Sequence, residues 1–153
     1  MFFSYYDSPI GKLQIIANEK AILEIDIVNR NEEENVNQVI INCKKELDEY
    51  FNGKRKEFTI PLELCGTDFQ KKVWQELLNI PYGEVVTYKS VAKKVGNEKC
   101  VRAVANAIGK NKHLIVIPCH RVIGTNGTLT GFRAGIPRKQ YLLKLEGINN
   151  FKK

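Results

Sequence analysis

The sequence predicts an α+β protein in two parts, an antiparallel sheet with one helix followed by a mainly helical part that contains a helix-turn-helix. Apolar and polar residues alternate over much of residues 2–28, and apolar residues recur every three or four positions over 32–51, which predicts the first part. Two short helical segments joined through Gly96 predict the second. Net charge divides the chain similarly: residues 1–62 carry eight basic and eleven acidic side chains, and residues 63–153 carry sixteen and six. We therefore expect two domains, 1–62 and 63–153.

The first part contains strand, turn and helix signals and no chemical motif. The Ser-Pro-Ile-Gly turn at residues 8–11 separates two expected strands, and a third is expected over 21–28. A helix is expected over 32–51, with Gly53 just beyond its end. We expect this α+β domain to support the rest of the chain.

The second part has helices with recognisable ends. Thr67 can cap the first of them, and Asn97 can cap the second helix of the helix-turn-helix. The apolar run 114–117 is expected to be a buried strand. Helices are expected over 68–78, 88–95 and 98–108, and from Pro137, as first residue, to a stop at Gly147.

The helix-turn-helix lies in the basic half, which favours a nucleic-acid partner. On charge alone, a solvated lysine-rich surface is an equal alternative. In the helix 98–108, Arg102 is expected to face outward, opposite a buried stripe. The stripe is expected to consist of Val101, Val104, Ala105 and Ile108.

Membrane and export signals are missing from the sequence. No apolar run reaches the roughly 18 residues of a membrane span, and the first residues do not resemble a signal peptide. The scattered cysteines are therefore expected to be reduced thiols of a cytoplasmic protein. They are Cys43, Cys65, Cys100 and Cys119.

Cys119 is the candidate nucleophile. It lies between an apolar run and a polar turn, beside His120 and Arg121, and nearby cationic or hydrogen-bonding groups favour the reactive thiolate. The alternative is a small buried apolar residue. In extended backbone His120 would point away from Cys119, so their contact requires a turn or a bridging water.

Glu146 is the second candidate. It lies in the last turn of the expected final helix, where a negative charge opposes the helix dipole. A residue that breaks a local rule often has a functional reason, although a frayed, exposed glutamate is the alternative. No second Cys or His lies at ligand spacing from Cys119 and His120, so no metal is expected, and no cofactor-binding loop is present.

The segment 117–122, Ile-Pro-Cys-His-Arg-Val, resembles the active-site signature of the O6-alkylguanine-DNA alkyltransferases, also called methylated-DNA–protein-cysteine methyltransferases. The similarity spans nearly the whole chain. Further matching residues are Ser8-Pro9-Ile10-Gly11, Phe69-Gln70, Val73-Trp74, Ile80-Pro81-Tyr82-Gly83-Glu84, Tyr88, Arg102-Ala103-Val104, Asn111, Leu142-Leu143 and Glu146-Gly147.

The resemblance implies a ribonuclease H-like first domain and a monomer that binds double-stranded DNA carrying O6-alkylguanine. Its recognition helix would enter the minor groove, and the damaged nucleotide would be flipped out. Arg102 would fill the gap that the flipped base leaves, and Tyr88 would crowd the 3′ phosphate. Lys89, Asn97 and Thr125 match further positions that contact the DNA backbone.

The chemistry implied by the resemblance is an irreversible, single-turnover alkyl transfer from O6-alkylguanine, and also from O4-alkylthymine, to Cys119. His120 would act as a base through a water molecule and be polarised by Glu146. Asn111 would brace the turn before the active site, and Tyr88 or Lys139 could protonate the departing guanine. The guanine pocket would be lined by the Val122 carbonyl, Phe132, Arg133 and Lys139.

Two other classes of protein share some of these features. A non-catalytic helix-turn-helix regulator or alkyl-lesion sensor would bind DNA without accepting the alkyl group, but such sensors replace the nucleophile that Cys119 provides. A cysteine hydrolase would need a base, an orienting residue and an acyl substrate.

Overall fold

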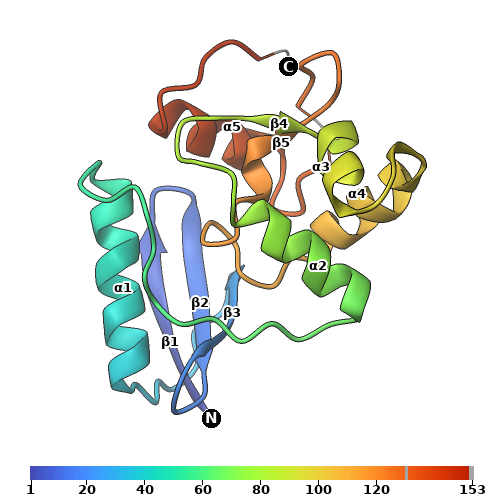
Figure 1. Cartoon of the computed structure of the whole chain (residues 1–153). Helices are drawn as coiled ribbons and strands as arrows, with labels where there is room; N and C mark the ends of the chain where they lie inside the picture. Colours follow the sequence, from blue (N-terminus) through green and yellow to red (C-terminus); the bar gives the residue numbers. More distant parts are fainter. Residues whose placement is uncertain (130, 152–153) are drawn as a thin grey trace. The chain divides into compact units, whose positions relative to one another are not determined.

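The computed structural model describes residues 1–129 and 131–151, which fall into two compact units. The first unit comprises residues 1–65 together with 112–114, and the second comprises 66–111 and 115 onward. The chain therefore enters the first unit twice. The expected division into two consecutive segments, 1–62 and 63–153, does not include this return of residues 112–114 to the first unit. Figure 1 follows the chain through both units.

The first unit is a three-stranded antiparallel sheet with a helix across one face (Figure 1). The strands β1 (Phe2–Ser8), β2 (Gly11–Ala17) and β3 (Ile22–Ile27) pair in sequence order, as the turn at residues 8–11 predicts. The helix is α1 (Gln38–Phe51). Fully buried side chains from the sheet and the helix form the core, and they include Leu13, Ile15, Ile25, Ile40, Leu47 and Tyr50.

The helix α1 starts six residues later than the spacing of apolar residues predicts. Asn37 is the N-cap, and its side-chain oxygen accepts from the Ile40 N–H at 3.1 Å. Just before it, Asn35 exchanges two backbone hydrogen bonds with Phe3, at 2.9 and 3.0 Å. The expected start at residue 32 was wrong because the sheet uses the backbone of Asn35.

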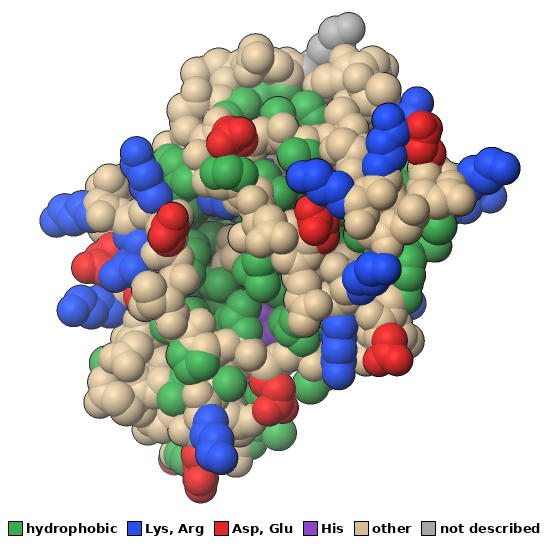
Figure 2. Space-filling model, in the orientation of Figure 1, with side chains coloured by type: hydrophobic (Ala, Val, Ile, Leu, Met, Phe, Trp, Pro, Cys, Tyr) green, Lys and Arg blue, Asp and Glu red, His purple; other side chains and the backbone are tan. Residues whose placement is uncertain are grey.

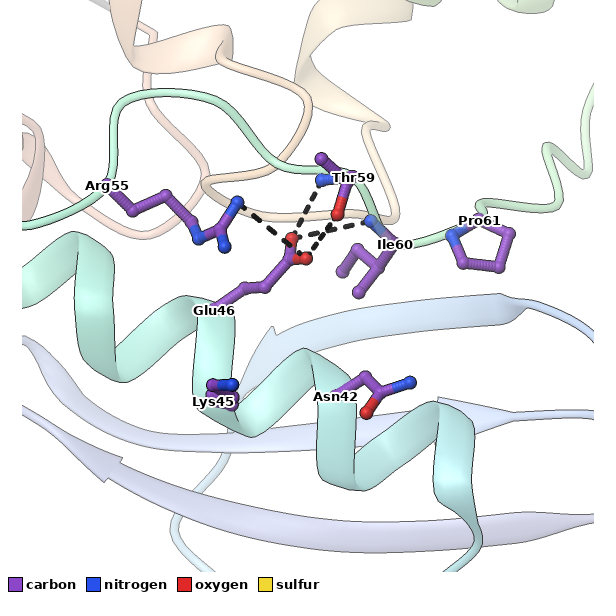
Figure 3. Close-up of a pocket in the computed structure, with 7 residues that line it drawn as sticks. All are labelled: Asn42, Lys45, Glu46, Arg55, Thr59, Ile60 and Pro61. Carbon is purple, nitrogen blue, oxygen red and sulfur yellow. Dashed lines mark hydrogen bonds and ion pairs between the residues drawn. The ribbon is translucent and has the colours of Figure 1, made fainter.

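A buried carboxylate fastens the segment after α1 to that helix. Glu46 accepts from the Thr59 N–H at 2.8 Å, the Thr59 hydroxyl at 2.5 Å and the Ile60 N–H at 3.3 Å (Figure 3). Arg55 lies 3.8 Å from the same carboxylate. Each oxygen of this buried acid has partners within the protein. The polar cluster in Figure 3 therefore has a structural role, because it holds residues 59 and 60 against α1.

Residues 112–114 form a parallel bridge to β3. The Ile25 N–H donates to the Lys112 carbonyl at 2.8 Å, and the Leu114 N–H donates to the Ile25 carbonyl at 3.1 Å. His113 is 1% exposed, and its Nε2 lies 2.8 Å from the Ile22 carbonyl oxygen. Both the backbone and one side chain therefore attach this short segment to the sheet.

Within its described residues, the second unit contains four α-helices, of which the first two have clear capping signals. The four helices are α2 (Asp68–Leu77), α3 (Tyr88–Val95), α4 (Val101–Gly109) and α5 (Ile136–Leu145). Thr67 caps α2 in a capping box with Gln70, as predicted for its start, and Thr87 caps α3 in the same way. Asn97 caps the short 3₁₀ turn η1 (Glu98–Cys100) that leads into α4.

The helices α2, α3 and α4 pack on one another, so α3, η1 and α4 form the expected helix-turn-helix arrangement (Figure 1). Trp74 of α2 is 1% exposed, and its Nε1 donates to the Ala107 carbonyl at 2.8 Å. This hydrogen bond joins α2 to α4 and satisfies the one polar atom of a large buried ring.

The buried stripe of α4 differs from the expected one. Val104, Ala107 and Ile108 are buried, whereas Val101 and Ala105 are exposed. The expected stripe was wrong because Ala107, whose carbonyl accepts the hydrogen bond from Trp74, lies on the buried face of α4. Val101 and Ala105 therefore share the open face with Arg102.

The remaining elements surround the segment that carries Cys119. A 3₁₀ turn η2 (Cys119–Arg121) leads into β5 (Val122–Ile123), which pairs in parallel with β4 (Val86–Thr87). The helix α5 packs against η2. A small apolar cluster completes this region and consists of Ile123, Leu129, Leu143 and Ile148.

The run 114–117 is buried, as predicted, but it is a turn and not a strand. Ile115 has φ 75°, in the left-handed region that β-branched residues rarely adopt. That conformation cannot continue an extended strand. Outliers of this kind cost on the order of 1–3 kcal/mol and persist where the surrounding packing fixes them.

None of the helices in residues 1–129 and 131–151 combines the length and apolarity that a bilayer crossing requires. Lysine and arginine side chains stand out over the region of α3 and α4, with acidic side chains among them (Figure 2).

The buried His113 predicts a pH dependence of stability. Burial lowers its pKa below the ordinary 6.5, and the hydrogen bond to Ile22 offsets this only in part. The folded protein therefore keeps His113 neutral, while the unfolded chain takes up a proton below about pH 6.5. The stability is fully present above that pH and falls as the pH is lowered, by at most ~1.4 kcal/mol per pH unit for this group.

Urea unfolding of the wild type and His113→Gln between pH 5 and pH 7 measures this effect. We expect a shallower pH dependence in the variant, with His120 supplying what remains. Equal slopes in the two proteins would contradict the assignment to His113.

Candidate active site

The candidate site is built around Cys119, which a proline turn presents. Pro118 has φ −80° and ψ 64°, the geometry of an inverse γ-turn, and the Cys119 N–H donates across it to the Ile117 carbonyl at 2.7 Å. The proline ring holds φ in this region. Cys119 then opens η2 and is 5% exposed. The backbone on both sides therefore fixes the orientation of the thiol.

Asn111 holds this turn from the end of α4. Its Nδ2 donates to the Ile117 carbonyl at 2.9 Å and lies 3.2 Å from Cys119 Sγ. Asn111 is 1% exposed, so both contacts are shielded from solvent. The side chain meets the backbone before the nucleophile and the nucleophile itself, in the position expected for a brace.

A buried cluster of three charged or titratable side chains lies beside the turn. Nε2 of His120 is 2.7 Å from Glu146 Oε2, and Arg121 makes two bonds to Glu146, at 2.8 and 3.1 Å. The Gly83 N–H also donates to Glu146, at 3.2 Å, and Arg121 Nη1 donates to the Ile80 carbonyl at 2.7 Å. Glu146 is the C-cap residue of α5 and is 6% exposed, so the frayed, exposed alternative is wrong.

Glu146 is ionised in this cluster. Burial alone would raise the pKa of its carboxyl, but the hydrogen bonds from His120 and Arg121 and the charge of Arg121 outweigh burial and lower the pKa to about 2. Burial lowers the pKa of His120 despite the opposing effect of Glu146, so the imidazole is neutral at pH 7. Arg121 therefore carries the positive charge that balances Glu146.

The thiol is also neutral at rest. Burial raises the pKa of Cys119, against the lowering effects of the Asn111 hydrogen bond and the positive charges of Lys139 and Arg133. A neutral imidazole beside a neutral thiol means that the nucleophile forms only when a base removes the proton during the reaction.

His120 lies next to the nucleophile without bonding to it directly. Its Nε2 is held by Glu146, and its Nδ1 is buried with no hydrogen-bond partner among the described residues. Because Nε2 donates its proton to the carboxylate, Nδ1 is the nitrogen that can accept one. With the 3₁₀ turn at Cys119, the described residues thus show no direct hydrogen bond between the thiol and Nδ1 of the imidazole.

Lys139 lies on the inner side of the site and is fully buried. Its Nζ donates to the Val122 carbonyl at 2.5 Å and lies 5.8 Å from the ring centre of Tyr88 and 6.0 Å from that of Phe132. Burial lowers the Lys139 pKa to about 8, and a thiolate at Cys119 would act in the opposite direction. The structure thus brings together four residues that the sequence analysis assigned to the pocket or to proton transfer.

An open pocket of about 450 Å³ lies between α4 and the loop after β5. Gly131 has φ +63°, and a Cβ built there would lie 3.1 Å from the Tyr88 hydroxyl, so a glycine allows this close approach. The pocket joins three residues predicted to contact DNA, Tyr88, Arg102 and Thr125. The other lining residues are Val101, Ala105, Gly124 and Gly131.

Two further predicted DNA contacts lie outside this lining. Asn97 accepts from the Lys99 N–H at 2.7 Å and so caps the start of η1, the turn before α4. Lys89 pairs with Glu98 at 3.7 Å across exposed side chains. Both are on the helix-turn-helix, and the structure does not bring them to the pocket.

Arg121 is the site residue that the sequence analysis left without a role. The signal was its place in the motif, directly after His120, but sequence alone does not show that its side chain is buried against Glu146. Over the described ranges, no group of three or more His, Cys, Asp or Glu side chains is placed to hold a metal ion.

Both units match models of known domains. Residues 68–148 match the DNA binding domain of 6-O-methylguanine DNA methyltransferase, and residues 1–64 match the ribonuclease-like domain of the same family. The chain belongs to the 6-O-methylguanine DNA methyltransferase family. The fold expected from the resemblance, a ribonuclease-like domain followed by a DNA-binding domain, is confirmed.

Individual relatives support this family membership, two of them over nearly the whole chain. A methylated-DNA–protein-cysteine methyltransferase of Methanosarcina barkeri is 41% identical over 156 residues, 97% of this chain and 99% of the relative. The structure of Mycobacterium tuberculosis OGT in complex with DNA has a TM-score of 0.88 and 38% identity, and covers 95% of this chain and 92% of its own. The structure of S. pombe Atl1 in complex with damaged DNA containing O6-carboxymethylguanine has a TM-score of 0.50 and 33% identity, and covers 56% of this chain and 82% of its own.

The buried pair of Glu146 and Arg121 predicts a large loss of stability when one partner is removed. Glu146→Gln leaves the Arg121 charge buried without its counter-charge, which should lower the free energy of unfolding by about 3–5 kcal/mol. Denaturant unfolding measures the loss. The double variant Glu146→Gln/Arg121→Met should recover much of it, because the unmatched charge is gone.

Glu76→Gln is the matched control. Glu76 pairs with the exposed Lys94 at 3.7 Å, and such pairs contribute up to ~1 kcal/mol. If Glu146→Gln lost no more stability than Glu76→Gln, the buried cluster would not have the energetic role inferred from its geometry.

Proposed function

We propose that this chain repairs O6-alkylguanine in double-stranded DNA by direct reversal, and that each molecule accepts one alkyl group irreversibly on Cys119. Family membership supplies the reaction class, the transfer of a methyl group from DNA to a protein cysteine. The observation that supports the assignment of Cys119 is its surroundings. Among the four cysteines, all of which lie in the described residues, Cys119 is the one on a fixed turn, against Asn111 and beside a His–Glu–Arg cluster.

In the proposed reaction, Sγ of Cys119 attacks the carbon bound to O6 as the thiol proton leaves. A water molecule would pass that proton to Nδ1 of His120, and the Nε2–H bond to Glu146 stabilises the imidazolium that results. A new S–C bond forms, and the C–O6 bond breaks with its electron pair remaining on guanine. The neutral resting thiol and imidazole support this order of events.

The departing guanine must gain a proton as the bond to O6 breaks. Lys139 is suited to supply it because burial holds its pKa at about 8, so proton donation is easier than from an ordinary lysine. Tyr88 lies beside Lys139 and lines the adjacent pocket, and is the other candidate. The Val122 carbonyl and Phe132 are proposed to hold the base itself.

The open pocket supports a flipped nucleotide as the form in which the substrate is bound. Arg102 lies on the exposed face of α4, where it can fill the space that the base leaves, and Ala103 and Ala105 on that face allow close approach to the duplex. We place α4 in the minor groove, where base-sequence information is sparse and lesions of any context can be reached. We further propose that the protein acts as a monomer and also accepts alkyl groups from O4-alkylthymine.

The main alternative is a lesion-binding protein that accepts no alkyl group, and a cysteine hydrolase is the second. Intact-mass measurement after mixing with an O6-methylguanine duplex separates them. The repair function requires a permanent gain of one CH₂ group, whereas a sensor leaves the mass unchanged and a hydrolase forms at most a transient acyl adduct. Peptide mapping should place the gain on Cys119.

Stoichiometry is the first prediction from this proposal. The product on Cys119 is a thioether, whose sulfur is a poor leaving group, so excess methylated duplex should give a burst equal to the protein concentration and then no further transfer. Cys119→Ala should give no burst and retain DNA affinity within a few-fold, because phosphate contacts supply most of the binding. Several methyl groups removed per molecule, or transfer to another cysteine in the variant, would refute the proposal.

Base flipping gives the second prediction. Arg102→Ala should slow repair of duplex DNA by roughly 10- to 100-fold while changing the reaction with free O6-methylguanine base little, because flipping costs a few kcal/mol only in the duplex. Lys99→Ala, which removes a neighbouring charge, is the control for phosphate attraction. Equal losses on duplex and free base would assign Arg102 to folding or chemistry.

A further inference from the structure

Two cationic side chains flank Cys119, and they differ in position. Lys139 is fully buried behind the nucleophile, whereas Arg133 is exposed at the rim of the site. Arg133 Nη2 donates to the Asn111 carbonyl at 2.6 Å, and the Asn111 side chain in turn lies 3.2 Å from Cys119 Sγ. The guanidinium is thus anchored beside the residue that braces the nucleophile.

The carboxylate of Glu146 does not cancel these charges. Glu146 is bonded to Arg121, whose side chain is 8% exposed, so the two charges of that pair balance each other locally. The charges of Lys139 and Arg133 both stabilise the thiolate of Cys119. The reacting centre therefore has a positive potential, and Arg133 supplies its solvent-facing part.

We infer that Arg133 is a specificity-determining residue that raises the transfer rate of alkyl groups carrying a negative charge, such as the carboxymethyl group of O6-carboxymethylguanine, relative to neutral groups of equal size. This inference rests on the proposed alkyl transfer to Cys119 and adds a substrate preference to it.

The chemistry explains why a cation matters at this position. Sγ attacks the CH₂ carbon, the thiol proton leaves toward His120, and the C–O6 bond breaks with its electron pair remaining on guanine, which takes up one proton. The product is S-carboxymethylcysteine. During the attack a forming thiolate approaches a carbon that bears a carboxylate, and their repulsion slows the reaction unless a nearby cation offsets it.

The experiment uses three duplexes that differ only in the O6 group: methyl, carboxymethyl and carbamoylmethyl. The carbamoylmethyl group is the neutral counterpart of carboxymethyl with the same number of heavy atoms. Single-turnover transfer rates are measured for each duplex at low ionic strength. The readout is the rate with carboxymethyl divided by the rate with carbamoylmethyl, in which effects on folding, DNA binding and the position of Cys119 cancel.

We expect Arg133→Gln to lower this ratio about tenfold, the effect of one charge at several ångströms near a protein surface. Arg133→Lys should keep most of the ratio, because it keeps the charge. Arg138→Gln is the matched control: Arg138 also carries one charge in this unit, but it donates to the Ala134 carbonyl at the start of α5. We expect it to leave the ratio unchanged.

The outcomes are distinct. A ratio that is the same in the wild type and Arg133→Gln, or that falls equally in Arg138→Gln, overturns the role of Arg133. If Arg133→Gln is unstable, the wild-type ratio at rising salt replaces it, and a ratio that salt does not lower overturns the inference. A wild type that takes no methyl group from the methyl duplex refutes the proposed function instead.

Discussion

The bonds from Arg121 and His120 to the buried carboxylate of Glu146 are the interactions on which the rest of the site depends. Taking a carboxylate out of water is unfavourable unless its charge and lone pairs are matched, and here a guanidinium, an imidazole and the Gly83 N–H match them. Replacing such a cluster by apolar residues need not lower stability, so its value lies in geometry. It fixes which imidazole nitrogen carries the proton, and it joins the end of α5 to the turn that contains Cys119.

The backbone around Cys119 fixes the orientation of a buried, neutral thiol. Pro118 sets the turn, Asn111 bonds to both sides of it, and Ile115 adopts a left-handed conformation just before it. The burial of the apolar run 114–117 offsets the cost of that conformation. The turn thus fixes the position of a sulfur that is un-ionised at rest.

The sequence predicts the locally determined features well. The starts of α2 and α3 and the cap at Asn97 follow from side chains that bond to their own backbone, so a single sequence contains the information. The run 114–117 was wrongly expected to be a strand, because apolar composition indicates burial but not the φ of Ile115. Arg121 was missed for a related reason, since its partner lies 25 residues away and only the fold brings them together. The roles given to the other site residues stay predictions, although the structure brings Tyr88, Arg102 and Thr125 to one pocket.

The parallel bridge between β3 and residues 112–114 has a consequence for the modularity of the chain. A cut at the end of the first domain would separate this segment from its strand, and the Lys112 carbonyl and Leu114 amide would lose the partners that they have in Ile25. A fragment that begins at residue 63 would thus contain every side chain of the candidate site but lack the anchor immediately before the Cys119 turn. Grafting the helical half onto another support would therefore require a new strand edge for residues 112–114.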